Sequence, residues 1–269
     1  MLWEPMAGFV VHPGAVTPYE RLRSHPTYPA RHLAPAASSE GPSTSKQASA
    51  TRSKQPSAAR YYAALARSAP WVLEYGAGRG TISWSMAAAG ARVVAVDLSG
   101  LLLADLVAQG RTLPREVARR ISVRQADART LRLRRRFPLV VAPENTLAHF
   151  YSRRDLEAFF AGVRHHLTPG GRFVFDVALP RFAELTEGYD PLAQVRHRDV
   201  EEGVTLAERQ FHPRELEMLL HYNGFSGLRM RGDFTRRRPD AGTQVLVVEA
   251  RADRGRPERS RKPTENRAC

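Results

Sequence analysis

The stretch "VLEYGAGRGTISWSMAAAGARVVAVDLSG", which runs from Val72 to Gly100, decides the fold. An apolar run leads into three alternating glycines, a short apolar segment and a second apolar run that ends at a carboxylate, Asp97. This order predicts a strand, a tight turn, a helix and a second strand. The dinucleotide-binding pattern is G-x-G-x-x-G, but here the glycines give G-x-G-x-G and Thr81 stands where the last glycine would be. The rest of the chain must therefore identify the ligand.

Strand-like and helix-like segments alternate beyond this stretch. Ser152 and Asp155 form a capping box before an apolar helix face, and "TPGG" (168–171) is expected to end that helix and turn into the next strand. Another helix is expected from Pro213 to Gly224. Several strands are apolar on consecutive residues, which favours a parallel sheet covered by helices on both faces. The expected strands are 71–75, 92–97, 121–127, 137–142 and 172–177, followed by the two runs of a hairpin, "GLRMRGDF" and "TQVLVVEA".

These segments predict an α/β fold, a doubly wound, mostly parallel seven-stranded sheet with a C-terminal antiparallel hairpin. We expect this domain over 58–250, with a cap helix near 59–68 and a short substrate or lid insertion at about 180–210. The Pro/Ser-rich segment 1–57 and the basic tail 251–269 are expected to be disordered.

The net charge of +14 at first suggests a nucleic-acid partner, but the charge gathers at the ends of the chain. Residues 1–60 and 251–269 each carry seven Lys and Arg against three acids. Nucleic acid is therefore allowed but not favoured as a partner. No apolar run reaches the roughly 18 residues of a membrane span, and no secretory signal is evident. The only cysteine, Cys269, predicts a reducing, cytoplasmic setting and excludes cysteine-based zinc sites, and we expect no metal.

Three acids gather around the predicted glycine turn. Asp97 ends the second strand 21 residues after Gly76, Asp127 ends the third strand, and Glu74 precedes the glycines by two residues. At such places a carboxylate can accept hydrogen bonds from ribose hydroxyls or from an exocyclic amine. Three acids disfavour a pyrophosphate and favour a ligand with positive charge. S-adenosylmethionine fits, since it has a ribose, an adenine, an ammonium and a sulfonium, but no phosphate.

At these residues the chain resembles the class I S-adenosylmethionine-dependent methyltransferases, over about 60–250. The resemblance rests on five segments in the family's order: "LEYGAGRG", "VVAVDLS", "QADART", "LTPGGRFVFDV" and "ELEMLLHYNGF". It implies a Rossmann-like methyltransferase fold, S-adenosylmethionine as cofactor and a small-molecule acceptor.

The resemblance also implies which residues bind the cofactor. The glycines would approach the methionine part and the ribose, and the acid before them would orient the turn or bind the ammonium. The acid after the second strand would bind the ribose, and the acid after the third strand, with its neighbour, the adenine. In that order these residues are Gly76, Gly78 and Gly80, then Glu74, then Asp97 with Leu98, and finally Asp127 with Ala128.

The loop "APENTLAHF" (142–150) follows the fourth strand and would face the methyl group. By resemblance, Asn145 and His149 are the candidate catalytic residues, although His149 could instead shape the pocket or make a structural hydrogen bond. Glu144 stands where relatives often have an aromatic residue. The other histidines weighed are expected at the surface or as helix caps: His165, His166, His197, His212 and His221.

The first functional hypothesis is methyl transfer from S-adenosylmethionine to O or N of a small molecule. The core offers no cysteine nucleophile, no lysine and no Asn/Asp-Pro-Pro-aromatic segment, which disfavours several nucleic-acid methylation chemistries. The alternatives are a non-catalytic S-adenosylmethionine-fold binding or assembly protein, and an RNA methyltransferase. An NAD-dependent oxidoreductase is disfavoured by Thr81 and Asp127. The acceptor and the oligomeric state stay open.

Overall fold

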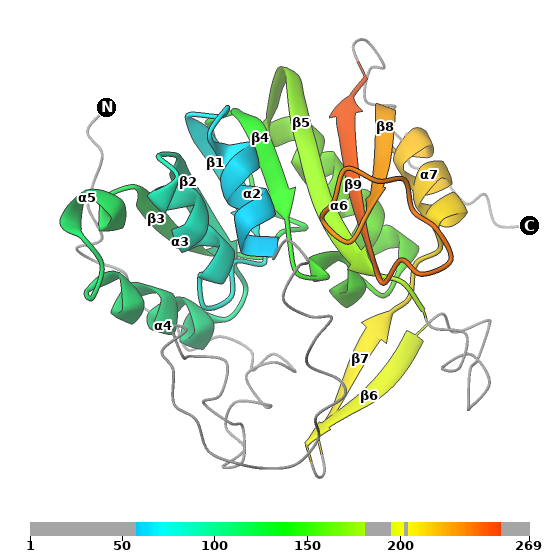
Figure 1. Ribbon diagram of the computed structural model, residues 1–269, viewed down its shortest axis with the longest axis horizontal. Coiled ribbons are helices and arrows are strands. Elements are labelled where there is room, and N and C mark those ends of the chain that lie inside the picture. The colour runs from blue at the N-terminus through cyan, green and yellow to red at the C-terminus, as the bar shows by residue number, and fades with distance from the viewer. Residues whose placement is uncertain (1–57, 181–194, 202–203, 254–269) are drawn as a thin grey trace, which may run out of the picture.

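The protein is described by a computed structural model that defines residues 58–180, 195–201 and 204–253, with the side chains of 195–207 left out. The expected disordered segment 1–57 and most of the expected tail lie outside the described residues. Within these ranges the chain forms one large sheet, a set of flanking helices and a separate two-stranded sheet (Figure 1).

The large sheet has seven strands in the order β3-β2-β1-β4-β5-β9-β8. The first five pair in parallel, while β9 runs antiparallel to both β5 and β8. This confirms the predicted doubly wound sheet with its C-terminal hairpin. The strands are β1 (Trp71–Tyr75), β2 (Arg92–Asp97), β3 (Ile121–Gln125), β4 (Phe137–Ala142), β5 (Leu167–Ala178), β8 (Phe225–Gly232) and β9 (Val245–Ala252).

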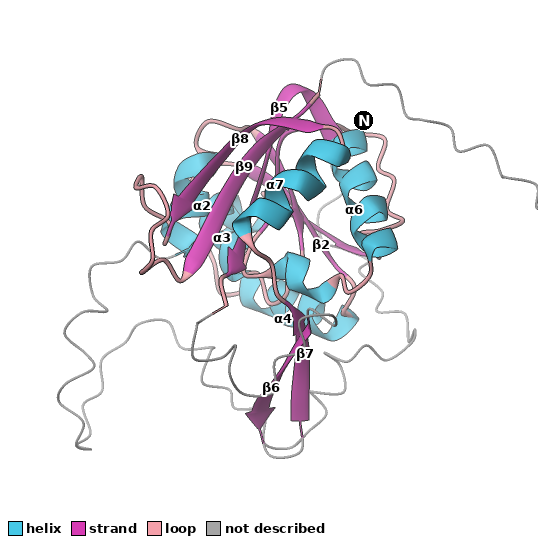
Figure 2. Ribbon diagram, turned by 90° about the vertical axis from the view of Figure 1, so that its right-hand side faces the viewer, coloured by secondary structure: helices cyan, strands magenta, loops and turns pink. Residues whose placement is uncertain are grey.

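Helices cover both faces of this sheet, so β1, β2 and β4 are buried along most of their length (Figure 2). One apolar cluster joins the sheet to α6 and α7, and a second joins it to the other helices. Burial on both faces explains why these strands read as continuous apolar runs. The helices are α2 (Ala58–Ala66), α3 (Thr81–Ala88), α4 (Gly100–Gly110), α5 (Arg115–Ala118), α6 (Arg153–His166), α7 (Pro213–Tyr222) and the short 3₁₀ helix η3 (Thr146–His149).

Strand order reverses at β1, which pairs with β2 on one side and β4 on the other. Ligands of open α/β sheets bind outside the carboxyl ends of the strands at such a reversal. The turns after β1, β2, β3 and β4 all leave this edge of the sheet, the lower edge in Figure 1. The topology thus brings the predicted site residues to one edge.

The insertion after β5 contains a two-stranded antiparallel sheet, β6 (Val195–Glu201) and β7 (Val204–Arg209). It projects from the same edge of the large sheet (Figure 1), and β7 packs against η3. The sequence predicted an insertion here but assigned it no strands.

The first residues of α6 and α7 are capped by side chains, as the sequence predicts. The Ser152 hydroxyl caps α6 by accepting from the Asp155 amide at 3.1 Å, and it donates to the Asp155 carboxylate at 2.7 Å. His212 is the N-cap of α7, and its amide donates to Glu215 at 3.4 Å. The prediction for "TPGG" is only partly right, because β5 already begins at Leu167 and the glycines form an irregularity within the strand.

His166 corrects another expectation, because it is fully buried and is neither a surface residue nor a cap. The Leu133 amide donates to its Nε2 at 2.8 Å, so the proton sits on Nδ1, which lies 2.8 Å from the Tyr75 hydroxyl. Burial lowers the pKa of His166 to about 4, which keeps this structural link neutral. His165 and His221 are exposed as expected, and the side chain of His197 lies outside the described residues.

Candidate active site

The three glycines of the turn after β1 serve different purposes, although all have positive φ. A Cβ on Gly76 would lie 2.3 Å from the Thr146 hydroxyl, and one on Gly80 would lie 2.6 Å from Leu106 of α4. A Cβ on Gly78 would meet no atom of the described residues within 4 Å. Gly76 and Gly80 are therefore required by packing, and Gly78 is the glycine that faces open space for a ligand.

Asp97 connects the ends of the first two strands. Its Oδ2 accepts from the Gly78 amide at 2.8 Å, and its Oδ1 accepts from the Ser99 amide at 2.8 Å. Each carboxylate oxygen of Asp97 thus holds one backbone amide at this edge of the sheet. Leu98 is 47% exposed and Leu101 is 43% exposed, which gives this half-buried carboxylate an apolar border.

Glu74 is a buried carboxyl group beneath the glycine turn, 1% exposed. Its Oε2 accepts a short hydrogen bond from the Ser83 hydroxyl of α3, while its Oε1 has no hydrogen-bond partner among the described residues. Burial raises the pKa of Glu74 to about 8; the charges of Glu144 and Asp97 add to this, and the Ser83 hydrogen bond opposes it. An unpartnered buried oxygen is costly, and a cationic donor would satisfy it.

This burial predicts a pH dependence of stability that Glu74→Gln removes. Between about pH 4.5 and 8 the folded protein holds a proton on Glu74 that the unfolded chain releases. The free energy of unfolding therefore falls by up to about 1.4 kcal/mol per pH unit from this residue, and the slope ends above its folded pKa.

Urea unfolding of the cofactor-free protein at several pH values measures this. As the pH rises through that window, the free energy of unfolding of Glu74→Gln should increase relative to that of wild type, because only wild type loses stability by releasing this proton. Glu116→Gln, an exposed acid of α5, serves as the control and should follow the wild type. Parallel curves for wild type and Glu74→Gln would contradict the burial of a protonated carboxyl.

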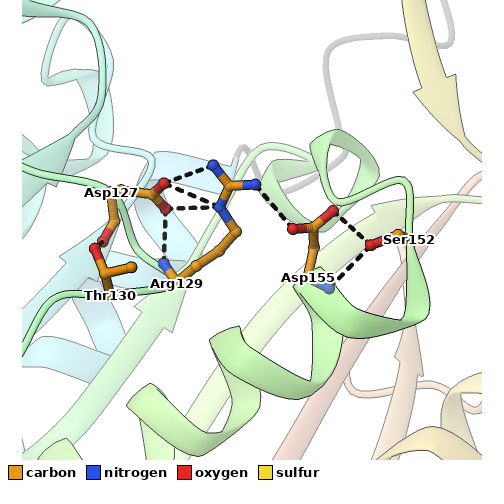
Figure 3. A network of polar contacts seen from close by, with 5 residues as sticks. All are labelled: Asp127, Arg129, Thr130, Ser152 and Asp155. Carbon is orange, nitrogen blue, oxygen red and sulfur yellow. Dashed lines mark hydrogen bonds and ion pairs between the residues drawn. The ribbon is translucent and has the colours of Figure 1, made fainter.

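Asp127 lies two residues past the end of β3 and belongs to an ion-pair network (Figure 3). The Arg129 guanidinium donates to both Asp127 oxygens, at 2.6 to 3.0 Å, and to Asp155 at the start of α6, at 2.8 Å. These bonds hold the pKa of Asp127 below its ordinary value. Arg129 thus ties the loop to α6, and an adenine amine would have to share the Asp127 carboxylate with Arg129.

Ala128 sits close to α6 through its backbone. A Cβ on Gly162 of α6 would lie 3.3 Å from the Ala128 carbonyl oxygen, so the glycine lets the loop approach the helix. The predicted contact of this loop with adenine stays a prediction.

The loop after β4 has an unusual backbone. Glu144 and Asn145 are consecutive non-glycine residues with positive φ, 53° and 62°. The Asn145 side-chain oxygen accepts from the Ala178 amide at the end of β5, at 3.1 Å. In this arrangement Asn145 acts through its backbone and its amide to hold the loop, and its predicted catalytic role stays a prediction.

His149 ends η3, where β7 packs against it. Burial lowers the pKa of His149 below 6.5, and the negative charge of Glu208 on β7 acts in the opposite direction. Glu208 is 8% exposed, and the buried side-chain oxygen of Gln210 has no hydrogen-bond partner among the described residues. At neutral pH the imidazole of His149 is therefore neutral.

The sequence analysis missed two acids at this edge, Asp176 of β5 and Glu208 of β7. Asp176 is 4% exposed within an otherwise apolar strand. A single acid inside the run "RFVFDV" is a signal that could have found it, because isolated buried carboxylates need partners. Nothing in the insertion distinguishes Glu208 from its charged neighbours.

A separate cavity of about 260 Å³ lies at the opposite end of β5, where it is lined by Ser68, 168–172 and Arg251. It is remote from the predicted site residues, which all follow the carboxyl ends of strands. Within the described residues, no group of three or more His, Cys, Asp or Glu could hold a metal ion, and no helix there has the length and apolarity to cross a membrane.

Comparisons with known proteins agree with this geometry. A family model described as a methyltransferase domain matches residues 72–171. Residues 72–171 therefore match a domain of the kind that the class I S-adenosylmethionine-dependent methyltransferases share. This match and the strand order confirm the predicted resemblance and the predicted fold.

Individual proteins are similar to parts of this chain. Cypemycin N-terminal methyltransferase from a Streptomyces species is 34% identical over 109 residues, 40% of this chain and 42% of that protein. The match thus spans less than half of that relative. The CcbJ methyltransferase from Streptomyces caelestis has a TM-score of 0.64 at 27% identity, over 73% of this chain and 88% of that one. The glycopeptide N-methyltransferase MtfA, solved with S-adenosyl-L-homocysteine, has a TM-score of 0.58 at 24% identity, over 72% and 88%.

Proposed function

We propose that this methyltransferase transfers a methyl group from S-adenosylmethionine to a nitrogen atom of a small molecule or peptide. The observation that carries the proposal is His149, held neutral beside the buried Glu208 at the end of the fourth strand. The ends of the first three strands carry the residues assigned to the cofactor, which leaves this fourth end for the acceptor.

The residues present fit S-adenosylmethionine. The unpartnered Oε1 of Glu74 suits its ammonium, the Asp97 carboxylate at the end of β2 suits its ribose hydroxyls, and the open space at Gly78 admits its chain. When bound, this cofactor supplies a methyl group on a positively charged sulfur. The protein then mainly has to hold the acceptor atom in line with that group.

A nitrogen acceptor explains the chemistry of the facing wall. An amine is mostly protonated at neutral pH and must lose a proton before its lone pair can attack. His149, neutral at that pH, can accept the proton, and the Glu208 carboxylate attracts the cationic form of the amine. The printed names of two relatives, an N-terminal methyltransferase and a glycopeptide N-methyltransferase, support nitrogen as the acceptor atom.

Two measurements on the full chain test the proposal. Calorimetric titration with S-adenosylmethionine, S-adenosylhomocysteine and NAD should show binding of the first two alone. Methyl transfer to short peptides with a free amino terminus should then exceed transfer to the same peptides after acetylation, to hydroxyl-bearing analogues and to RNA. NAD binding would overturn the cofactor assignment. Cofactor binding without turnover of any acceptor would favour a non-catalytic binding protein.

We also propose that the methyltransferase domain spans 58–253 and works in the cytoplasm. The Asp253 amide donates to the Gly224 carbonyl at 2.9 Å, which extends the packed chain just beyond the expected boundary at residue 250. The single cysteine, Cys269, supports a reducing compartment.

A further inference from the structure

Asp176 is a buried carboxylate that no step of the proposed reaction uses. It lies on β5 among apolar residues and accepts three hydrogen bonds. The Tyr62 hydroxyl donates to its Oδ1 at 2.6 Å, and the Glu144 amide donates to the same oxygen at 3.0 Å. The Asn145 amide donates to its Oδ2 at 3.3 Å. This one side chain therefore joins three segments, α2, β5 and the loop after β4.

The two backbone amides belong to the strained part of the loop. Glu144 and Asn145 both have positive φ, a conformation that is unfavourable for residues other than glycine. It persists only where the surroundings hold it. Asp176 supplies this hold, because both amides point at its carboxylate. The loop leads directly into η3, which ends at His149.

The Asp176 carboxylate is also held by Tyr62 of the cap helix, α2. Tyr62 is fully buried, and burial together with Asp176 raises its pKa well above 10, so its hydroxyl stays a donor. Its neighbour Tyr61 packs edge-on against it at 5.5 Å between ring centroids, but does not bond to Asp176. The Asp176 side chain thus links α2 to the loop after β4.

We propose that Asp176 is a positioning residue, which together with Tyr62 holds the loop after β4 so that His149 faces the acceptor. This inference rests on the proposed function for its catalytic meaning. Packing alone does not explain an acid at this point, since a buried carboxylate is costly unless its hydrogen bonds are used. The bonds that are used here point at the loop backbone.

The charge of Asp176 gives this arrangement a pH dependence. Burial raises the pKa of Asp176 to about 6, against the three hydrogen bonds it accepts. The titratable groups that face it are Tyr61 and Tyr62 from α2 and Glu144 from the loop. Below about pH 6 the carboxyl gains a proton and loses acceptor capacity toward the loop amides, so the loop loosens as the pH falls.

The test compares Asp176→Asn with wild type, with Tyr61→Phe as the matched control. In Asp176→Asn an amide NH₂ faces a backbone donor, so one loop amide loses its acceptor. Hydrogen exchange of a peptide covering 143–149, followed by mass spectrometry at pH 7.5, should quicken several-fold in this variant. Turnover of the peptide amine should fall about tenfold, while the dissociation constant for S-adenosylmethionine stays within about threefold. Tyr61→Phe should match the wild type in all three.

A second variant, Tyr62→Phe, separates positioning from bulk structure. Its loss of a hydrogen bond raises the pKa of Asp176, so the pH below which exchange of the 143–149 peptide quickens beyond its intrinsic pH dependence should move up, whereas Tyr61→Phe should leave that pH in place. Unchanged loop exchange in Asp176→Asn would overturn the proposal, as would an unmoved threshold of loop exchange in Tyr62→Phe. Loop exchange that quickens as expected, with no acceptor turned over by wild type, would support Asp176 as the hold on the loop and count against methyl transfer instead.

Discussion

His149→Ala is expected to lower the turnover number by about 10²–10⁴-fold, the contribution of a positioned general base. The dissociation constant for S-adenosylmethionine should stay nearly unchanged. The physical reason is position, since His149 follows the fourth strand while the residues assigned to the cofactor follow the first three. Steady-state methyl transfer to the peptide amine, together with cofactor titration, measures both quantities.

His149→Gln distinguishes a base from a residue that shapes the pocket. Glutamine keeps a hydrogen-bonding group but cannot accept the proton, so it should restore turnover only if the role is positional. The pH profile adds a second criterion. Because burial lowers the pKa of His149 below 6.5, the base form is present at neutral pH, and turnover should fall as the pH drops through that lowered value. A fully active His149→Ala would remove the residue from the site.

The central sheet could be predicted because its determinants are local in sequence. Strands such as 92–97 and 137–142 are buried on both faces, so their apolar runs are continuous and their bounds agree with the structure. The glycine turn could also be predicted, because few residues other than glycine adopt the positive φ found at Gly76, Gly78 and Gly80.

Features that depend on contacts between distant segments escaped prediction. His166 is a polar residue at the end of an amphipathic helix, and only the packing of α6 on Tyr75 shows that it is buried. The β6–β7 hairpin carries many charges and no clear alternation, so its sequence gives no strand signal.

In the candidate site, too, residues with a local sequence signal were predicted and residues defined by distant contacts were not. Glu74 and Asp97 were found because each stands at a fixed distance from the glycine turn along the chain. The hydrogen bonds from Tyr62 and the loop after β4 to Asp176 were not predicted, because Asp176 lies 114 residues from Tyr62 and 31 from Asn145. The same region of the loop is tied to the end of β5 a second time, because the Asn145 side-chain oxygen accepts from the Ala178 amide.

Asp97→Ala is expected to weaken S-adenosylmethionine binding at least tenfold. Hydrogen bonds to a charged group contribute about 1.5–3 kcal/mol, and each 1.4 kcal/mol is a factor of ten in affinity. Asp97 ends β2 beside the glycine turn, where a carboxylate can accept hydrogen bonds from ribose hydroxyls. Calorimetry measures the loss, a thermal melt shows that the variant is folded, and Glu116→Ala is the control at an exposed acid.

Weaker binding alone does not separate contact with the ribose from damage to the turn, because Asp97 also holds the Gly78 amide. A cycle with 2′-deoxy S-adenosylhomocysteine makes the distinction. Wild type should bind this analogue more weakly than S-adenosylhomocysteine, whereas Asp97→Ala should bind the two almost equally, since the partner of the missing hydroxyl is gone. If the analogue lost as much affinity on the variant as on wild type, Asp97 would act only through the turn and the ribose would have to be bound by another group.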